Sequence, residues 1–562
     1  MKFSEMKYVR PDMEQMGTEI KELTHRLTDA CDYECALTVF KEAQELFDRL
    51  ETAAALAYVR HTIDTRDEFY DSENTFFDEE LPKLQPLVQE FSLALYHSEF
   101  RGDFEKQFGS LYFTNIELAL KCFKPEIVPM MQEENRLVSD YAKLIASAQI
   151  EFEGEKRTLS QLTPFKQSPD DILRRAAWRA EGEWYSAHSQ ELDKLYDELV
   201  KVRDETGKKL GGTDFIETGY CRMQRNCYDA SDVARFADAV EKYIVPIADR
   251  LMKAQAKRTG LEYPLDFADA ALSFRDGNAK PQGTGSDILE HGRRMYREMS
   301  PRTAEFIDFM FENELFDVES RTGKAAGGYC ITLGAYRAPF IFANFNGTSG
   351  DVEVMTHEAG HAFAAYASRD VFPVEYRSPS YESCEIHSMS MEFFAWDWAE
   401  GFFGKDTDKF KYSHLASALT FIPYGTMVDR FQHEMYAHPE YTPQRRHEVW
   451  RELLGRFMPW MKLGITPFYG EGKGWQRQTH IYERPFYYID YCLAQTAALS
   501  FWALMREDRE DAWNRYLALI DKAGTLDFNG LVSAAGLETP FGDDALRKIA
   551  GAAEKWLESH SV

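Results

Sequence analysis

Two histidines four residues apart, with a glutamate directly after the first, occur at His357, Glu358 and His361 in the run HEAGH. Four residues turn an α-helix through roughly 400°, so both imidazoles project from one face of the helix, one turn apart. Two imidazole nitrogens placed in this way can bind one zinc ion, with the glutamate close to a water on that ion. The spacing therefore indicates a zinc-dependent hydrolase, and most of all a peptidase. This interpretation requires that a helix and a third ligand are present.

The residues around this motif predict the helix that the chemistry requires. Residues 348–351 read Thr-Ser-Gly-Asp and supply capping side chains and an early negative charge, which suits a helix N-terminus. Apolar residues then recur at broadly helical spacing, and Pro373 follows the expected end. We therefore expect His357 and His361 in the middle of a helix, where apolar neighbours keep a metal site dry and rigid.

A third ligand is expected from a second amphipathic helix, over residues 382–394. Zinc hydrolases of this type commonly take a glutamate from a following helix and leave the fourth position to water. Spacing alone does not choose between Glu382 and Glu385, and His387 is a further candidate that leaves the helix in another direction. Glu392 follows Glu385 by seven residues, on the same face, where it could orient a ligand from behind.

Three segments together resemble one known family. The runs PFIFANFNG at 339–347, HEAGH at 357–361 and CEIHS at 384–388 are similar to those of the thimet oligopeptidase and oligoendopeptidase F family, most of all its bacterial Pz-peptidase-like members. The resemblance extends over essentially the whole chain. It implies one zinc ion per chain and makes Glu385 the third ligand, in a motif like E-[IV]-x-S. His387 departs from the Pro or Ala that relatives often carry there.

The same resemblance implies the groups on the other side of the site. In that family, a segment like residues 479–491 faces the metal across the cleft. Peptide hydrolysis creates an oxyanion, which a tyrosine hydroxyl or a histidine N–H can stabilise. His480 is therefore predicted as a catalytic residue. Tyr482, Tyr488 and Tyr491 remain alternatives for the tyrosines; we predict catalytic roles for Tyr488 and Tyr491 and substrate contact for Tyr482.

Strand signals occur just before the zinc helix, at 329–332 and 340–345. An edge strand beside a metal can pair with an extended peptide backbone, which would make binding tolerant of sequence. The resemblance places substrate contacts here, at Gly327, Gly328 and Ala343.

Helical patterns dominate the rest of the chain, for example over 13–28 and 36–59, and a short hairpin is expected at 150–159 with Gly154 in its turn. Ser168 and Pro169 are predicted to cap and begin another helix. By resemblance the fold is mostly α, a large neurolysin-like helical zinc-peptidase fold with a small β-sheet beside the active-site helix and an internal substrate channel. We expect two intimately packed parts, a mainly helical part over 1–200 that covers the channel and a catalytic part over 201–562.

Composition excludes several classes of partner. A formal net charge of −28 disfavours nucleic acid and anionic membrane surfaces, because phosphates would be repelled. Eight scattered cysteines without a C-x-x-C pair do not form a disulfide framework, so a reducing cytoplasm fits best. The chain shows no basic-then-apolar start and no apolar run of about 18 residues. We therefore expect a cytoplasmic protein; its oligomeric state is not indicated.

Together these features predict a zinc-dependent endopeptidase that hydrolyses internal bonds of short oligopeptides, with Glu358 as general base. A dipeptidyl carboxypeptidase would use the same metal site but needs a cation for the substrate's C-terminus, and the sequence assigns no single Arg or Lys to that role. A catalytically silent peptide-binding protein is disfavoured, because the ligands and the base are all present.

Overall fold

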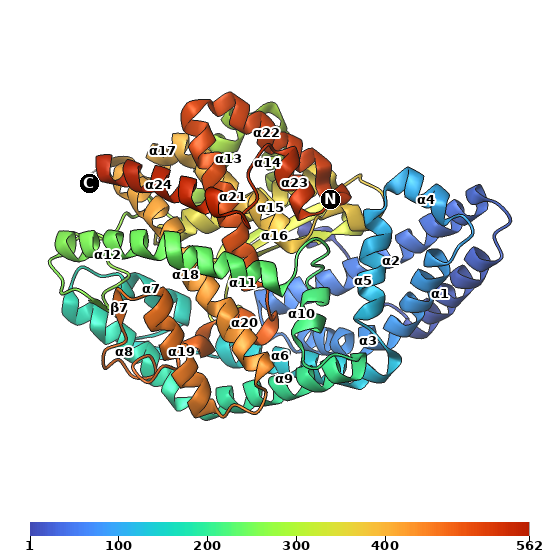
Figure 1. Cartoon of the computed structure of the whole chain (residues 1–562), viewed down its shortest axis with the longest axis horizontal. Coiled ribbons are helices and arrows are strands. Elements are labelled where there is room, and N and C mark those ends of the chain that lie inside the picture. Colours follow the sequence, from blue (N-terminus) through green and yellow to red (C-terminus); the bar gives the residue numbers. More distant parts are fainter. Residues whose placement is uncertain (561–562) are drawn as a thin grey trace.

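Helices account for 71% of the chain, which confirms the mostly α prediction. The structure is a computed structural model that describes residues 1–560 and, except at Asp543, their side chains. Blue N-terminal helices lie at one end in Figure 1, and the yellow and orange segments that carry the predicted site lie near the middle.

Five helices form the N-terminal end of the molecule. They are α1 (Met13–Thr28), α2 (Tyr33–Ile63), α3 (Glu68–Tyr96), α4 (Arg101–Phe108) and α5 (Leu111–Lys121). Asp12, Asp32 and Asp67 cap the first three, because each carboxylate accepts backbone N–H groups of the first turn. Apolar faces of these helices meet in a core around the fully buried ring of Phe40. The helix expected over 13–28 is therefore confirmed, and that over 36–59 lies within α2.

The next stretch forms a series of helices, some along the lower edge of Figure 1 and the green ones across its middle. Its elements are α6 (Val128–Ala146), β1 (Ile150–Phe152), β2 (Glu155–Arg157), α7 (Leu159–Lys166), α8 (Asp171–Ala187), α9 (Ser189–Leu210), α10 (Ile216–Arg222), α11 (Ala230–Ala239) and α12 (Val245–Thr259). Strands β1 and β2 pair antiparallel, and Gly154 makes their turn with φ of 79°, so the predicted hairpin is confirmed.

The predicted start of α8 was wrong by two residues. Asp170, not Ser168, is the N-cap, since its carboxylate accepts the N–H groups of Ile172 and Leu173. The Ser168 hydroxyl instead accepts the N–H of Asp170 in the turn before the helix. The carboxylate of Asp170 is a charged acceptor for the unpaired N–H groups of the first helical turn, and the neutral hydroxyl of Ser168 is a weaker one.

A three-stranded sheet lies directly before the predicted zinc helix. It consists of β4 (Phe316–Glu319), β5 (Tyr329–Leu333) and β6 (Ala338–Phe345) in the order β4-β6-β5. Strand β6 is central, parallel to β4 and antiparallel to β5, so β5 is an edge strand. The two predicted strands are thus confirmed. A separate short pair joins β3 (Leu265–Asp266) to β7 (Met461–Lys462).

The remaining helices build the catalytic end. They are α13 (Gly285–Met299), α14 (Pro301–Glu312), α15 (Gly350–Ser368), α16 (Tyr381–Phe394), α17 (Ala399–Phe403), α18 (Thr407–Ala437), α19 (Pro443–Phe457), α20 (Thr479–Glu483), α21 (Tyr488–Glu507), α22 (Arg509–Lys522), α23 (Phe528–Ala534) and α24 (Asp543–Ser559). Helix α16 packs between α15 and α21 in the centre of the largest apolar core. Both predicted helices of the metal site are therefore present, as α15 and α16.

Among residues 1–560, no helix is long and apolar enough to cross a membrane. All eight cysteines are free thiols.

Candidate metal and catalytic site

One glycine sets the distance between the two helices that carry the predicted metal ligands. A Cβ atom on Gly360 would lie 2.6 Å from the Cα of Ser388 and 2.8 Å from the carbonyl oxygen of His387, so a side chain there would push α15 off α16. Because that position has no side chain, α16 can lie against the face of α15 from which the two histidines project. The fourth residue of the HEAGH run therefore has a packing role.

The structure brings His357, His361 and Glu385 together. The Oε2 atom of Glu385 lies 3.2 Å from Nε2 of His357 and 3.3 Å from Nε2 of His361. Ligand bonds of 2.0–2.1 Å at tetrahedral angles place neighbouring ligand atoms about 3.3 Å apart, so these spacings fit a zinc ion. Burial lowers the pKa of His357, but Glu385 and Glu392 outweigh it and raise that pKa well above its usual value. The group therefore attracts positive charge.

Neither alternative third ligand joins this group. The Glu382 carboxylate is buried and accepts a hydrogen bond from Ser380 Oγ at 2.9 Å. His387 is buried elsewhere on α16, and its burial lowers the ring's pKa to about 3. Of the candidates that spacing left open, the structure brings only Glu385 to the two histidines, because it alone projects from α16 towards α15.

Glu392 lies behind His357, as the sequence suggested. Its Oε1 accepts a hydrogen bond from Nδ1 of His357 at 2.7 Å. The ring proton is then on Nδ1, and the lone pair on Nε2 points towards Glu385 and the metal position.

Glu358 has the environment that a general base requires. Its side chain is buried, and among the described residues Oε2 has no hydrogen-bond partner. Burial raises its pKa, while His357 and His361 oppose the shift. An unpaired carboxylate beside a metal position can accept a proton from water.

The predicted His480 lies in a directed chain of hydrogen bonds on the opposite wall. Tyr424 donates to Gln478 Oε1 at 2.9 Å, and the Gln478 amide donates to Nδ1 of His480 at 3.1 Å. The ring proton is therefore on Nε2, which donates to the Tyr491 hydroxyl oxygen at 3.1 Å. Burial, and then the charge of Arg484, lower the pKa of His480 to about 4, so the ring is neutral. The Tyr491 O–H proton remains free to donate.

Tyr487 is a site residue that sequence reasoning missed. Its hydroxyl donates to Oε1 of Glu385 at 2.5 Å, while the other oxygen of this carboxylate faces the two histidines. Tyr487 precedes Tyr491 by four residues, a spacing that shares a helix face and could have signalled it. The sequence left the alignment of the tyrosines in this segment open, and Tyr487 lies at the boundary of α21 as its N-cap residue.

Tyr488 and Tyr482, the other two predicted tyrosines, lie in different surroundings. The ring of Tyr488 lies edge-on to His480, with centroids 5.2 Å apart, so it belongs to the same wall. Tyr482 is fully buried, stacked on Tyr141, and its hydroxyl donates to the carbonyl of Leu192. These contacts do not support the prediction that Tyr482 binds substrate, because a lone tyrosine is readily absorbed into a core.

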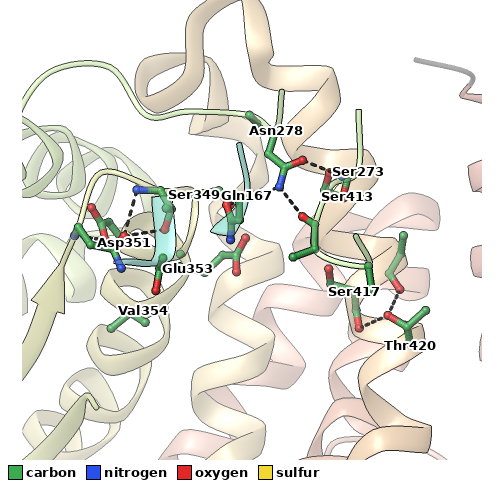
Figure 2. Close-up of a pocket in the computed structure, with 18 of the residues that line it drawn as sticks. Gln167, Ser273, Asn278, Ser349, Asp351, Glu353, Val354, Ser413, Ser417 and Thr420 are labelled. Atoms are coloured by element: carbon green, nitrogen blue, oxygen red, sulfur yellow. Dashed lines mark hydrogen bonds between the residues drawn. The ribbon is translucent and has the colours of Figure 1, made fainter. Parts of the chain in front are cut away.

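A cavity of about 530 Å³ opens beside the first turns of α15, where Ser349, Asp351 and Glu353 line it (Figure 2). Gly327 and Gly328, which were predicted to contact substrate, line this cavity together with Glu353, one turn before His357 on α15. A Cβ on Gly328 would lie 3.4 Å from Oε1 of Glu358, which puts this end of β5 next to that carboxylate.

Ala343 is not accessible to a substrate, contrary to the predicted substrate contact. Its side chain is fully buried, its carbonyl accepts a hydrogen bond from Lys324, and β6 is paired on both sides. A peptide cannot add to a central strand, so the available edge is β5.

A His–His–Glu group on two adjoining helices, with a buried glutamate beside it, is the arrangement of zinc-dependent hydrolases. Residues 3–123 match the Peptidase M3 N-terminal domain, and residues 164–551 match Peptidase family M3. The chain therefore belongs to peptidase family M3, whose members are metallopeptidases.

Known proteins of this family are similar over different lengths. The chain is 46% identical to a solved PZ peptidase A bound to an inhibitor, with a TM-score of 0.98 over 99% of each chain. It is 42% identical to a Bacillus anthracis protein provisionally named oligoendopeptidase F, with a TM-score of 0.94 over 100% of this chain and 98% of the other. An oligoendopeptidase F homolog of Borreliella burgdorferi is 28% identical over 222 residues, 37% of this chain and 36% of that relative's length. The predicted family is confirmed.

Proposed function

We propose that this protein is a zinc-dependent endopeptidase that cleaves internal bonds of short oligopeptides. The observation that carries the proposal is the geometry of His357, His361 and Glu385, whose facing atoms are 3.2 and 3.3 Å apart. When bound there, a zinc ion would polarise the scissile carbonyl and acidify a water molecule.

Glu358 supplies the proton transfers. Its unpaired Oε2 accepts a proton from the attacking water, and the same carboxyl then protonates the leaving amine. Because burial raises its pKa, this carboxyl holds the proton more readily between the two steps than an exposed glutamate would.

Tyr491 stabilises the oxyanion from the opposite wall. His480 donates to its oxygen, so the tyrosine's own O–H proton is left for the substrate. Burial and the nearby Glu385 raise the pKa of Tyr491 well above its usual value, which keeps the hydroxyl protonated.

Substrate backbone would add to the edge of β5 and extend into the cavity beside Gly327 and Gly328. Asn344 holds this entrance in shape, since its amide donates to the carbonyls of Ala325 and Gly327 at 2.9 and 2.8 Å. Backbone pairing explains how peptides of varied sequence could bind. The names of the relatives, an oligoendopeptidase F homolog and a PZ peptidase A, support short peptides as substrates. We place the enzyme in the cytoplasm, because free thiols suit a reducing compartment.

Glu358→Gln tests the proposal directly. The amide keeps the size of the side chain but cannot accept the proton, so turnover of an N-blocked, C-amidated oligopeptide should fall by about 10²–10⁴-fold. Mass spectrometry of the fragments locates the cut, and zinc content is measured in parallel. An internal cut that a chelator prevents, together with wild-type zinc content in the variant, is expected. Wild-type turnover by the variant would reject Glu358 as the base.

A dipeptidyl carboxypeptidase remains the second candidate because of Arg484. This residue is exposed, and among residues 1–560 its guanidinium makes no hydrogen bond or ion pair. It lies three residues before Tyr487, which contacts Glu385, so it could hold a substrate's C-terminal carboxylate. Comparing free-acid and amidated forms of one peptide separates the candidates. An exopeptidase releases C-terminal dipeptides from the free acid alone, and Arg484→Gln would remove that preference.

A further inference from the structure

Glu392 is held from two sides, and only one of them is a predicted metal ligand. Its Oε1 accepts from Nδ1 of His357 at 2.7 Å, and its Oε2 accepts from Nε2 of His414 at 2.8 Å. His414 comes from α18, a helix that carries none of the predicted site residues. Both side chains are largely buried, with 14% of Glu392 and 6% of His414 exposed. A buried carboxylate with two N–H donors has little freedom to rotate.

Trp396 sets the direction of this chain of hydrogen bonds. Its indole N–H lies 3.0 Å from Nδ1 of His414 and is buried with it. An indole nitrogen can only donate, so Nδ1 of His414 must accept and the ring proton must be on Nε2, aimed at Glu392. Glu392 then has both oxygens occupied as acceptors, and the proton between it and His357 stays on His357.

We propose that Trp396 and His414 are positioning residues of the metal site. Acting through Glu392, they fix the orientation and tautomer of His357 so that its Nε2 lone pair faces the metal. This inference rests on the metal site proposed above. It extends the support of that site to Trp396, which reaches the proposed ligand His357 only through His414 and Glu392.

The chain contains a matched pair that lacks this connection. Trp475 donates to Nδ1 of His447 at 3.1 Å, and both residues are buried, as in the first pair. Nε2 of His447, however, lies 3.8 Å from the nearest oxygen of Asp193, beyond hydrogen-bond reach. The two pairs therefore share the indole–imidazole bond and differ in what the imidazole reaches.

The experiment compares Trp396→Phe with Trp475→Phe in the full-length protein. Each variant loses one buried indole N–H, so both should lose similar thermal stability. Only Trp396→Phe lets His414 carry its proton on Nδ1 and leaves Glu392 without its second donor. We expect its zinc affinity, measured by competition with a chromophoric chelator, to fall about 10-fold, at the lower end of the range for outer partners of metal ligands. Trp475→Phe should stay within about twofold of the wild type.

Two readouts separate positioning from general destabilisation. The visible spectrum of the cobalt(II)-substituted protein reports ligand geometry and should change in Trp396→Phe but not in Trp475→Phe. His414→Phe should weaken zinc by about 10–100-fold, and His414→Gln should restore part of it, because an amide N–H can still donate to Glu392.

Equal zinc affinities and identical cobalt spectra in the two tryptophan variants would overturn the inference, as would wild-type affinity in His414→Phe. Should Trp396→Phe fail to fold, the His414 pair decides alone. Failure of the wild type itself to bind zinc would instead reject the proposed metal site, so the two failures are distinguishable.

Discussion

Each wall of the site contains a chain of hydrogen bonds that passes through a histidine, and the two chains support groups of opposite charge preference. On the α15–α16 wall, Trp396 donates to His414, which donates to Glu392. On the α20–α21 wall, Gln478 donates to His480, which donates to Tyr491. In both chains a fixed donor occupies Nδ1 of a histidine and forces its proton onto Nε2.

The two chains differ in the group at which they end. The first chain ends on Glu392, which supports the proposed metal ligand His357. The carboxylate proposed as a ligand, Glu385, is held ionised: burial raises its pKa, but His361 and His357 outweigh this and lower it well below the usual value. The second ends on Tyr491, a hydroxyl whose pKa is raised and which keeps its proton. One wall therefore attracts a cation, and the other offers a neutral hydrogen-bond donor to developing negative charge. This difference predicts that changes on the first wall alter metal binding, while changes on the second alter turnover.

The largest effect is expected at Glu385 on the metal wall. Glu385→Ala removes one of three protein ligands, so zinc affinity should fall by more than the roughly 10–100-fold typical of losing an outer partner, and activity should fall with it. Zinc content after dialysis measures the effect, and Glu385→Gln is the size-matched control for the buried volume. Full metal occupancy in the alanine variant would contradict the assignment of Glu385 as a ligand.

An effect confined to turnover is expected at Tyr491, because its side chain is not among the proposed metal ligands. Tyr491→Phe removes the free O–H donor and should lower kcat by about 10²–10³-fold, the range for one oxyanion donor, while zinc affinity stays unchanged. Tyr488→Phe is the matched control on the same helix, since the ring of Tyr488 also contacts His480 but its hydroxyl makes no hydrogen bond among the described residues. Equal losses in the two variants would remove the distinction between these tyrosines.

The smallest change in kcat is expected at His480. The pH profile of kcat/KM tests the role of this residue more strictly than the size of that change. His480→Gln keeps an N–H donor but not the rigid ring, so kcat should fall about 10-fold or less. Because burial, and then the charge of Arg484, lower the wild-type pKa to about 4, His480 is almost entirely neutral between pH 6 and 8 and its ionisation does not shape the pH profile there. The rise of kcat/KM with pH should follow Glu358, which must lose its proton to act as base, and should keep its midpoint in the variant. A shift of that midpoint would show that His480 titrates in the working range.

The sequence predicted the metal wall far better than the facing wall. His357 and His361 are related by local helix geometry, and the α16 helix that carries Glu385 was visible as a second amphipathic segment. Family resemblance then chose Glu385 over Glu382. The facing wall joins side chains of separate elements, and local spacing left the alignment of its tyrosines open, so Tyr487 was missed and Tyr482 was assigned to substrate. Ala343 was misplaced for a similar reason, because a strand's own residues do not show which strands flank it.

Local patterns in the sequence predict the helical character of the chain, the two helices of the metal wall and the His357–His361 pair, since each depends on spacing within one element. Which distant groups meet depends on how the elements pack. Gly360 lets α16 approach α15, α18 brings His414 to Glu392, and α21 brings Tyr487 to Glu385. These contacts join residues 22 to 102 positions apart, and no periodicity within one segment records them.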